Sequence, residues 1–527
     1  MIDPTAHALG RATVGDAIRR QGKRQPHHLA VVQYGPNDDR TAISYSQLAD
    51  RAARCAAGLR AHGVKRGDCV AIMATSSIEY IEVYVGAAML GAAVTGIGWK
   101  NISDDVVWQL NHADATLCVI GQERVDEIDS LRAQVPTVKT WCTTGSESRE
   151  GWVPSSNLFA YDPLLPEQLD VTEDDLLLLT YTSGSENRPK GVQIPHRNYV
   201  VSTTFSLMSA GYVSPRDVYL FIKPFHTIAG LGSITSLLLV GATLVLVEPV
   251  SPSRVLDVVA KERITTISQT PTFYTALTQH EEFATADVSS LRQCHTYGGL
   301  VSRPMLQSFA KYAPHVEWAS YWGQSELTQL GTIGWFSSFD DIPRGDPRWI
   351  GIPTPSLEVR VVDADGNDAE LGELLCRTPS VMRGYHKDPE RTAEVIDGGW
   401  VHTGDLVQQD EHGNLFFVDR IKDVVKTGGM NVSSLEVEDA LLRHPSISSA
   451  AVVGLPDDYW GEAVTAFVVA RPGHEVKPDE VIAFVKDTLT VYKVPKVVHV
   501  LESLPTDPQG KIRKRELRAQ YANNRTL

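Results

Sequence analysis

A loop of small, hydroxylated and glycine residues at 180–191 follows directly on four leucines at 176–179. The loop reads T-Y-T-S-G-S-E-N-R-P-K-G, and its last charged residue is Lys190. Small residues let a backbone approach a ligand, backbone N–H groups and hydroxyls donate hydrogen bonds, and a lysine supplies positive charge. The combination suits a polyphosphate, although it lacks the spacing of the Walker A loop. Taken alone, a loop of this composition after a strand is usually only a turn.

Two further motifs add groups that a bound nucleotide needs. The segment Y-W-G-Q-S-E at 321–326 sets an aromatic beside a glycine, so that a ring can stack on a flat base while the backbone passes close by. Its last residue, Glu326, could ligate a magnesium ion that also holds phosphates. The segment W-V-H-T-G-D ends in Asp405, which can accept hydrogen bonds from two ribose hydroxyls, although an ordinary turn aspartate is commoner. Arg420 follows in a charged run and could reach a ribose or a phosphate.

Two segments in the last part of the chain, a glycine pair and a turn-rich stretch, are further candidates for the chemistry. Gly428 and Gly429 form a pair that must either approach a ligand or flex. Lys511 lies in the turn-rich stretch L-P-T-D-P-Q-G-K-I-R-K-R-E-L at 504–517. The functional interpretation makes Lys511 a cation delivered to a reacting phosphate, and the structural one places it in a basic C-terminal helix.

Length, charge and cysteine content limit the class of protein. A chain of 527 residues exceeds one ordinary hydrophobic core, so at least two domains are expected. A net charge of −15 disfavours nucleic acid or an anionic membrane as a partner. The six cysteines are scattered without a C-x-x-C pair, which argues against a zinc site or a disulfide framework. No apolar signal segment opens the chain and no stretch is long enough to cross a bilayer, so we expect a cytoplasmic protein without an integral membrane segment.

Hydrophobic periodicity changes along the chain. Short apolar strands alternate with amphipathic helices, such as the one expected at 46–63, and this predicts α/β layers with largely parallel sheets. From about residue 350 the segments 357–367 and 415–420 predict antiparallel hairpins. After residue 422 a compact α+β segment follows. We therefore expect an N-terminal domain over 1–421 and a C-terminal domain over 422–527.

Taken together, the motifs resemble the adenylate-forming superfamily of acyl-CoA synthetases, peptide-synthetase adenylation domains and luciferases. The likeness covers nearly the whole chain, including the segments 224–230, 270–277, 290–299, 372–385, 454–462 and 492–496. The resemblance implies a large N-terminal domain of layered, mostly parallel sheets with helices and a small β-barrel-like part, a small mobile α+β C-terminal domain, and an active site between them. It also implies two half-reactions. A carboxylate attacks the α-phosphate of ATP to give acyl-AMP and pyrophosphate, and a nucleophile then takes the acyl group.

Carried over position by position, the resemblance assigns a set of ATP contacts. These are Thr182, Ser183, Gly184, Ser185, Lys190, Gly191, Gly298, Gly299, Tyr321, Trp322, Gly323, Asp405 and Arg420. The first six would wrap the β- and γ-phosphates. Trp322 stands where the family usually has a tyrosine against adenine, and Gly298 and Gly299 match the segment between adenine and the acyl pocket. Asp405 and Arg420 match the ribose contacts.

The resemblance also implies the catalytic and moving parts. Lys511 matches the lysine that bridges the substrate carboxylate and the α-phosphate, where it would stabilise charge developing in the transition state. Glu326 matches the magnesium ligand, and Ser325 takes a position often held by threonine. Lys422 matches the hinge about which the small domain rotates between the half-reactions. That rotation would withdraw Lys511 and bring the loop at 428–429 to the acceptor side of the site.

The acyl pocket implied by the resemblance is apolar. Its wall would include Phe225, His226, Ile228, Gly230, Tyr297, Leu300 and Leu327. We interpret His226 as a gate or pocket residue and not as a base. No lysine or arginine within 225–230, 297–300 or 322–332 awaits a second carboxylate, so an aliphatic or aromatic acid is expected.

The chain departs from the family pattern at two places. Glu186 and Asn187 stand where the phosphate loop usually has threonine and glycine. A carboxylate there should repel triphosphate oxygens unless it points outward or pairs with a cation such as Arg188, so the departure bears on ATP affinity. Lys223 and Pro224 shift the proline that normally lies two residues before the phenylalanine.

These observations leave several functions open. The leading one is ligation of a carboxylic acid, as a small-molecule substrate, to coenzyme A with ATP and Mg²⁺, because the hinge, the glycine loop and the segment Y-K-V-P-K are complete. An amine acceptor would instead give an amide, as in ligases similar to coronafacate ligase, and a carrier protein is a third acceptor. A non-catalytic adenylate-binding protein is motivated by Glu186 and Asn187, but Lys511 and Glu326 argue against it. Nothing points to a luciferase-like oxygenase, and a monomer and a homodimer both fit the sequence.

Overall fold

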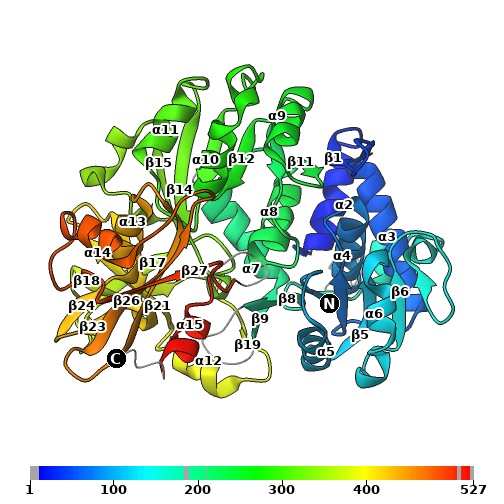
Figure 1. The fold of residues 1–527 in the computed structure, drawn as a ribbon. Helices are drawn as coiled ribbons and strands as arrows, with labels where there is room; N and C mark the ends of the chain where they lie inside the picture. Colours follow the sequence, from blue (N-terminus) through cyan, green and yellow to red (C-terminus); the bar gives the residue numbers. More distant parts are fainter. Residues whose placement is uncertain (1–10, 183–188, 209–210, 507–511, 523–527) are drawn as a thin grey trace. The chain divides into compact units, whose positions relative to one another are not determined.

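The computed structural model describes residues 11–182, 189–208, 211–506 and 512–522. Contacts between Cα atoms divide the chain into two compact units (Figure 1). The first unit comprises Met1–Val359 and Cys376–Val401, and the second comprises Arg360–Leu375 and His402–Leu527. This division runs through a strand near residue 402, so the domain boundary that the sequence suggests at residue 422 stays a prediction.

One sheet of the first unit carries the strands β2-β1-β11-β10-β12-β13-β14-β15-β16 in that order. Their bounds are β1 Leu29–Tyr34, β2 Arg40–Ser44, β10 Val218–Phe221, β11 Thr243–Val247, β12 Thr266–Gln269, β13 Gln293–Thr296, β14 Glu317–Trp322, β15 Thr332–Phe336 and β16 Trp349–Pro353. The strands from β1 to β14 in this order are parallel, whereas β2, β15 and β16 pair antiparallel with their neighbours. The α/β class expected from the alternation of elements is therefore confirmed.

The second sheet of this unit has the order β19-β9-β8-β4-β3-β5-β6-β7. Its strands are β3 Cys69–Met73, β4 Ala93–Gly96, β5 Ala115–Ile120, β6 Thr140–Thr143, β7 Val153–Pro154, β8 Leu176–Thr182, β9 Lys190–Pro195 and β19 Gly384–Tyr385. Strand β8 contains the four-leucine run and pairs antiparallel with β9. The predicted phosphate loop thus joins two neighbouring strands.

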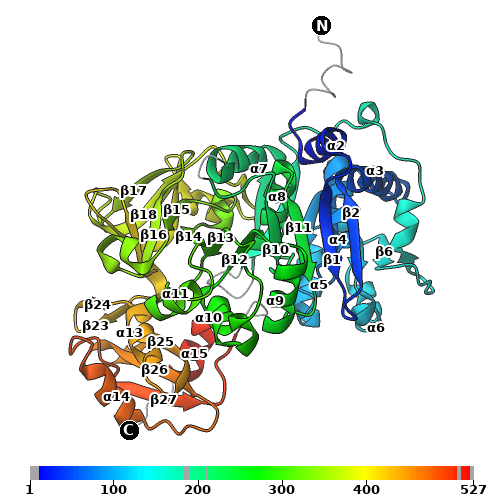
Figure 2. The same ribbon diagram turned by 90° about the horizontal axis from the view of Figure 1, so that it is seen from above.

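Helices pack on both faces of these sheets (Figure 2). They are α2 Val14–Arg24, α3 Tyr45–Ala61, α4 Ile78–Leu90, α5 Ser103–His112, α6 Val125–Asp129, α7 His196–Ser202, α8 Ser233–Val240, α9 Pro252–Lys261, α10 Pro271–Gln279, α11 Arg303–Ala310 and α12 Pro389–Val395. The apolar spacing that predicts a helix at 46–63 corresponds to α3, which begins at a capping box formed by Ser44 and Gln47. Every residue of α4 except Glu79 is buried, as expected of a helix that is apolar all round.

Alternation along the strands divides the core of the first unit. Val70 and Ile72 of β3 join a large cluster with residues of α2, α3, α4, α8 and the first sheet, whereas Ala71 and Met73 join a second cluster with α5 and α6. Successive strand side chains point to opposite faces, so both faces of β3 are covered. This explains why its sequence reads as a continuous apolar run.

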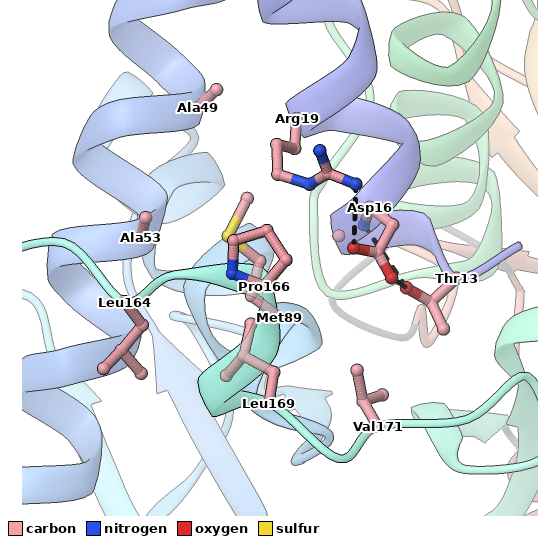
Figure 3. A pocket seen from close by; sticks show the side chains of 11 residues that line it. Thr13, Asp16, Arg19, Ala49, Ala53, Met89, Leu164, Pro166, Leu169 and Val171 are labelled. Carbon is pink, nitrogen blue, oxygen red and sulfur yellow. Dashed lines mark hydrogen bonds and ion pairs between the residues drawn. The ribbon is translucent and has the colours of Figure 1, made fainter. Parts of the chain in front are cut away.

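A small cavity lies among α2, α3, α4 and the segment 164–171 (Figure 3). Its volume is about 30 Å³, and its wall is mostly apolar. Its charged groups, Asp16 and Arg19, lie 3.4 Å apart and pair with each other. A space of this size holds a water molecule rather than a substrate, so we regard it as a packing defect.

In its described residues, the second unit contains mostly antiparallel strands, with β27 parallel to β26, and the helices α13, α14 and α15. Strands β17 Glu358–Val362, β18 Leu371–Arg377, β21 Trp400–Gln409 and β22 Leu415–Arg420 are consecutive in one sheet. The short strand β20, Ile396–Asp397, pairs with the first residues of β21 and belongs to the first unit. The other sheet has the order β24-β23-β26-β25, with β27 beside β26. Its elements are β23 Val425–Thr427, β24 Met430–Val432, β25 Ile447–Asp457, β26 Gly461–Ala470, β27 Val497–Leu501, α13 Ser434–Leu442, α14 Pro478–Lys486 and α15 Lys514–Tyr521. This matches the α+β segment expected from the sequence. Within the part of the chain that the structure describes, no helix combines the length and apolarity that a membrane crossing needs.

Candidate active site

The described ends of the predicted phosphate loop, Thr182 and Lys190, face each other across the β8–β9 hairpin. Thr182 pairs with Lys190 in the strand register. The Lys190 ammonium lies 4.8 Å from the ring centre of Tyr385 on β19, which pairs with the other side of β9. Ser183, Gly184, Ser185 and the departures at 186–188 lie outside the described residues.

Glu326 is held by a tyrosine that the sequence analysis did not single out. It belongs to a short 3₁₀ helix, Ser325–Leu327, that follows β14, and Ser325 there is buried. The Tyr385 hydroxyl donates a hydrogen bond to Glu326 Oε1 at 2.7 Å, and the backbone N–H of Met382 donates to the Glu326 carbonyl at 2.8 Å. Burial, reinforced by the Glu326 carboxylate, raises the pKa of Tyr385, so the phenol keeps its proton and remains a donor.

The residues Lys190, Tyr385 and Glu326 therefore form a continuous row of cation, phenol and carboxylate. Tyr385 ends the segment 372–385 that carries part of the family resemblance, and its position after a glycine was the available signal. Among the described residues, no group of three His, Cys, Asp or Glu side chains is placed to hold a metal ion. A single oriented carboxylate fits Mg²⁺, which usually takes one or two protein carboxylates and completes its shell with phosphates and water.

The turn after β14 requires its glycine. A Cβ added to Gly323 would lie 1.6 Å from the carbonyl oxygen of Gln329, so no larger residue fits there. Thr328 has a left-handed φ of 60° and accepts a hydrogen bond from the Asn198 side chain at 3.0 Å. These contacts fix the direction in which Glu326 leaves the strand.

Tyr321 and Trp322 point to opposite faces of β14, because they are consecutive strand residues. Trp322 is buried, and its ring passes close to Gly331. Tyr321 is half-buried, and its hydroxyl lies 3.0 Å from Ser268 Oγ and 3.2 Å from Lys223 Nζ. The two aromatic residues that the sequence groups in one motif thus lie in different surroundings.

The segment after β13 places Tyr297 beside Tyr321, with ring centres 5.2 Å apart. Gly298 follows with a left-handed φ of 68°, which favours glycine. Gly299 lies against Pro271, the first residue of α10, since a Cβ added to it would approach that ring to 3.3 Å.

The predicted acyl-pocket residues divide between core and partly exposed positions. Phe225 is buried and packs edge-to-face on Tyr80 at 5.1 Å and on Phe221 at 5.7 Å, and Leu327 is also buried. Four are half-buried, namely His226, Ile228, Tyr297 and Leu300. Gly230 is held tightly, because a Cβ there would lie 2.0 Å from the Pro224 carbonyl oxygen.

In the second unit, the two predicted ribose residues face each other. Asp405 on β21 and Arg420 on β22 are register partners, and Arg420 Nε lies 2.7 Å from Asp405 Oδ1. The Asp405 side chain is fully buried, whereas the Arg420 side chain is 37% exposed. The guanidinium also donates to the Thr403 carbonyl at 3.3 Å. The pair therefore presents an oriented guanidinium at the surface of its hairpin.

The predicted hinge and acceptor loop also lie in the second unit. Lys422 is in the 3₁₀ turn Ile421–Asp423, where Arg518 of α15 donates to the Lys422 carbonyl and pairs with Asp423 at 2.8 Å. Gly428 and Gly429 form the two-residue turn between β23 and β24, with φ of 55° and 77°, the signs that a tight hairpin turn requires. Lys511 lies outside the described residues.

Comparisons with known proteins cover nearly the whole chain. The family model of AMP-binding enzymes matches residues 18–386, and that of the AMP-binding enzyme C-terminal domain matches residues 436–511. The chain is 32% identical to a feruloyl-CoA synthase of Amycolatopsis sp over 516 residues, 95% of this chain and 98% of that relative. It is 30% identical to a long-chain fatty acid–CoA ligase of Mycobacterium tuberculosis over 514 residues, 97% of this chain and 98% of that one. The solved amide bond synthetase McbA of Marinactinospora thermotolerans matches it with a TM-score of 0.83 and 27% identity, covering 96% of this chain and 99% of that one. The chain belongs to the AMP-binding enzymes, the adenylate-forming family that includes the acyl-CoA synthetases.

Proposed function

We propose that this protein activates a carboxylic acid with ATP and transfers the acyl group from acyl-AMP to coenzyme A. The observation that carries the proposal is the row formed by Lys190, Tyr385 and Glu326, which combines a phosphate-binding cation with an oriented carboxylate. Similarity to two CoA ligases over nearly the whole of each chain supports coenzyme A as the acceptor.

Residues of the first unit would hold the triphosphate. Lys190 supplies positive charge beside the loop that enters β9, and the hydrogen bond from Tyr385 keeps the Glu326 carboxylate aimed in one direction. Glu326 would be the protein ligand of Mg²⁺, and the bound ion would neutralise part of the negative charge of the phosphates. Ser325 begins the same 3₁₀ helix, directly before Glu326, and is buried.

Residues of the second unit would hold the ribose and stabilise the negative charge that develops at the α-phosphate during the reaction. Asp405 accepts hydrogen bonds from the ribose hydroxyls, while Arg420 holds that carboxylate in place. Lys511 is the proposed cation at the α-phosphate, where it favours the transition state over the bound acid. Lys422 is the proposed hinge, and the turn at 428–429 is the proposed acceptor-side loop.

The test is mass spectrometry of products formed by the purified protein. The mixture contains ATP, Mg²⁺, coenzyme A, a pool of amines and amino acids, and a set of fatty, aromatic and polycyclic acids. We expect acyl-CoA products. Lys511→Ala should stop acyl-AMP formation while the thermal unfolding midpoint stays unchanged, and near wild-type activity of that variant would refute the proposed role.

A second candidate is an amide-forming ligase, which the similarity to the amide bond synthetase favours. It shares the first half-reaction and differs only in the acceptor. If the same experiment gave acyl amides without any thioester, the acceptor would be an amine and not coenzyme A. Formation of acyl-AMP alone would indicate an acceptor absent from the mixture, such as a carrier protein.

A further inference from the structure

Lys223 is a buried lysine whose ammonium group contacts hydroxyls and aromatic rings. Lys223 is only 2% exposed, and its Nζ lies 2.9 Å from Ser268 Oγ and 3.2 Å from the Tyr321 hydroxyl oxygen. The same ammonium lies 4.6 Å from the ring centre of Tyr297. Burial lowers the pKa of Lys223 to about 7.

These side chains come from one edge of the first sheet. Lys223 follows β10, Ser268 lies on β12, Tyr297 follows β13, and Tyr321 is near the end of β14. The four strands are parallel neighbours, so their carboxyl ends share one edge (Figure 2). Ligands of open α/β sheets bind outside this edge. The site therefore lies where a substrate group is expected.

Within the described part of the chain, this ammonium group contacts hydroxyls and aromatic rings and forms no ion pair with a carboxylate. An unpaired buried charge is costly. The neighbouring groups that titrate are Tyr297, Tyr321, Tyr212 and His295. Burial raises the pKa of each of the three tyrosines, so none supplies a negative charge at neutral pH. Burial, together with Lys223, lowers the pKa of His295, whose two ring nitrogens have no hydrogen-bond partner in the described part of the chain. The cluster thus offers positive charge and donors with no anion of its own.

The chain connects this cluster to the proposed acyl site. Tyr297 directly precedes Gly298, and Tyr321 directly precedes Trp322, so the rings that contact Lys223 belong to the segments proposed to hold the nucleotide and the acyl group. Both tyrosines are half-buried, which places Lys223 one side chain beneath the surface.

We infer that Lys223, Ser268 and Tyr321 bind a second carboxylate of the acid substrate, and this inference rests on the proposed function. The preferred substrates are then dicarboxylic acids, of which one carboxyl group is activated and the other pairs with the ammonium. A carboxylate has two oxygens and can accept from the ammonium and both hydroxyls at once. Lys223 lies two residues before the segment 225–230 that was expected to line the acyl pocket, so no cation was expected for a second carboxylate.

The experiment compares matched acids. Pyrophosphate release is measured with ATP, Mg²⁺ and coenzyme A for α,ω-dicarboxylic acids of increasing length and for terephthalate, each beside the monocarboxylic acid with one carboxyl group removed. We expect a higher kcat/KM for one diacid than for its partner. Lys223→Met should lower kcat/KM for that diacid about ten- to a hundredfold, the effect of a lost charge-assisted hydrogen bond, and leave the monoacid unchanged or improved.

Methionine is the chosen replacement because apolar residues of similar volume often replace a buried charge without loss of stability. Lys139→Met, at an exposed lysine on the same unit, is the matched control. Ser268→Ala removes one hydroxyl with little change in volume and should weaken the diacid preference by a smaller factor. Calorimetric titration of the diacid into wild type and Lys223→Met reports binding without turnover.

The pH dependence separates binding by charge from a structural role. For the diacid, kcat/KM should fall as the pH rises above about 7, because the free ammonium loses its proton there. The monoacid should not show this fall. Turnover of both acids with equal kcat/KM, or an equal effect of Lys223→Met on both, would overturn the inference. Absence of pyrophosphate release with every acid would instead overturn the proposed function, and the titration would still decide whether the diacid binds at Lys223.

Discussion

Tyr385→Phe removes a single hydroxyl and with it the hydrogen bond that orients Glu326. The phenolic oxygen lies 2.7 Å from Glu326 Oε1. The raised pKa of Tyr385, caused first by burial, keeps the donor protonated throughout the assay range. A hydrogen bond to a charged acceptor contributes about 1.5–3 kcal/mol. If the orientation of Glu326 matters in the adenylation step, kcat/KM for ATP should fall about ten- to a hundredfold.

The assay is pyrophosphate release at saturating acid, with ATP and Mg²⁺ varied together and then separately. The loss should be larger at low Mg²⁺, because a mobile carboxylate holds the ion less well. Tyr161→Phe, at an exposed tyrosine of the same unit, controls for the substitution itself. Wild-type kinetics in Tyr385→Phe at every Mg²⁺ concentration would refute the reasoning, because the contact to Glu326 would then have no part in the reaction.

Three further predictions concern other parts of the chain. Asp405→Asn should raise the KM for ATP and reduce the free energy of unfolding by about 1–3 kcal/mol in denaturant titrations, since it leaves Arg420 without its buried partner. Gly428→Ala places a side chain at a φ of 55°, which costs about 1–2 kcal/mol, so thioester formation should slow more than pyrophosphate release in single-turnover assays. Burial lowers the pKa of His196 to about 4, and its Nδ1 accepts a hydrogen bond from the Val14 N–H at 3.2 Å. On acidification the imidazole of His196 is therefore protonated in the unfolded chain before it is protonated in the folded chain. Between pH of about 6.5 and about 4, the free energy of unfolding should fall by about 1.4 kcal/mol per pH unit, and His196→Asn should reduce this loss.

The layered architecture could be predicted because its local signals agree with the tertiary environment. Helix α3 has apolar spacing and a serine cap, and β8 has four consecutive leucines because both of its faces are covered. The turn at 428–429 could be placed from its two glycines, since a tight hairpin needs positive φ. The unit boundary near residue 402 has no such signal, because β21 continues through it as an ordinary strand.

The site was predictable where it is contiguous in sequence and not where it is assembled across strands. Asp405 and Arg420 were assigned separately, and their register across the β21–β22 hairpin brings them into contact. Tyr385 was missed because its role depends on β19 pairing with β9, a contact between residues far apart in the chain. Lys223 was noted only for shifting a proline. Its meaning comes from Ser268 and Tyr321 on neighbouring strands, which a reading along the chain does not place beside it.

The opposite orientations of Tyr321 and Trp322 have a consequence for how such an enzyme can change its substrate. In the proposed reaction, Trp322 belongs to the nucleotide site, whereas the Tyr321 hydroxyl belongs to the hydroxyl and ammonium cluster around Lys223. Because strand geometry separates the two rings, a substitution at Tyr321 or Lys223 can alter the contact to the acid without moving Glu326, which Tyr385 holds from β19. The pairwise effects of Lys223→Met and Tyr385→Phe on kcat/KM should therefore be additive for the diacid, since the two residues share no contact. Strong coupling between them would show instead that the bound acid and Glu326, the proposed magnesium ligand, move together.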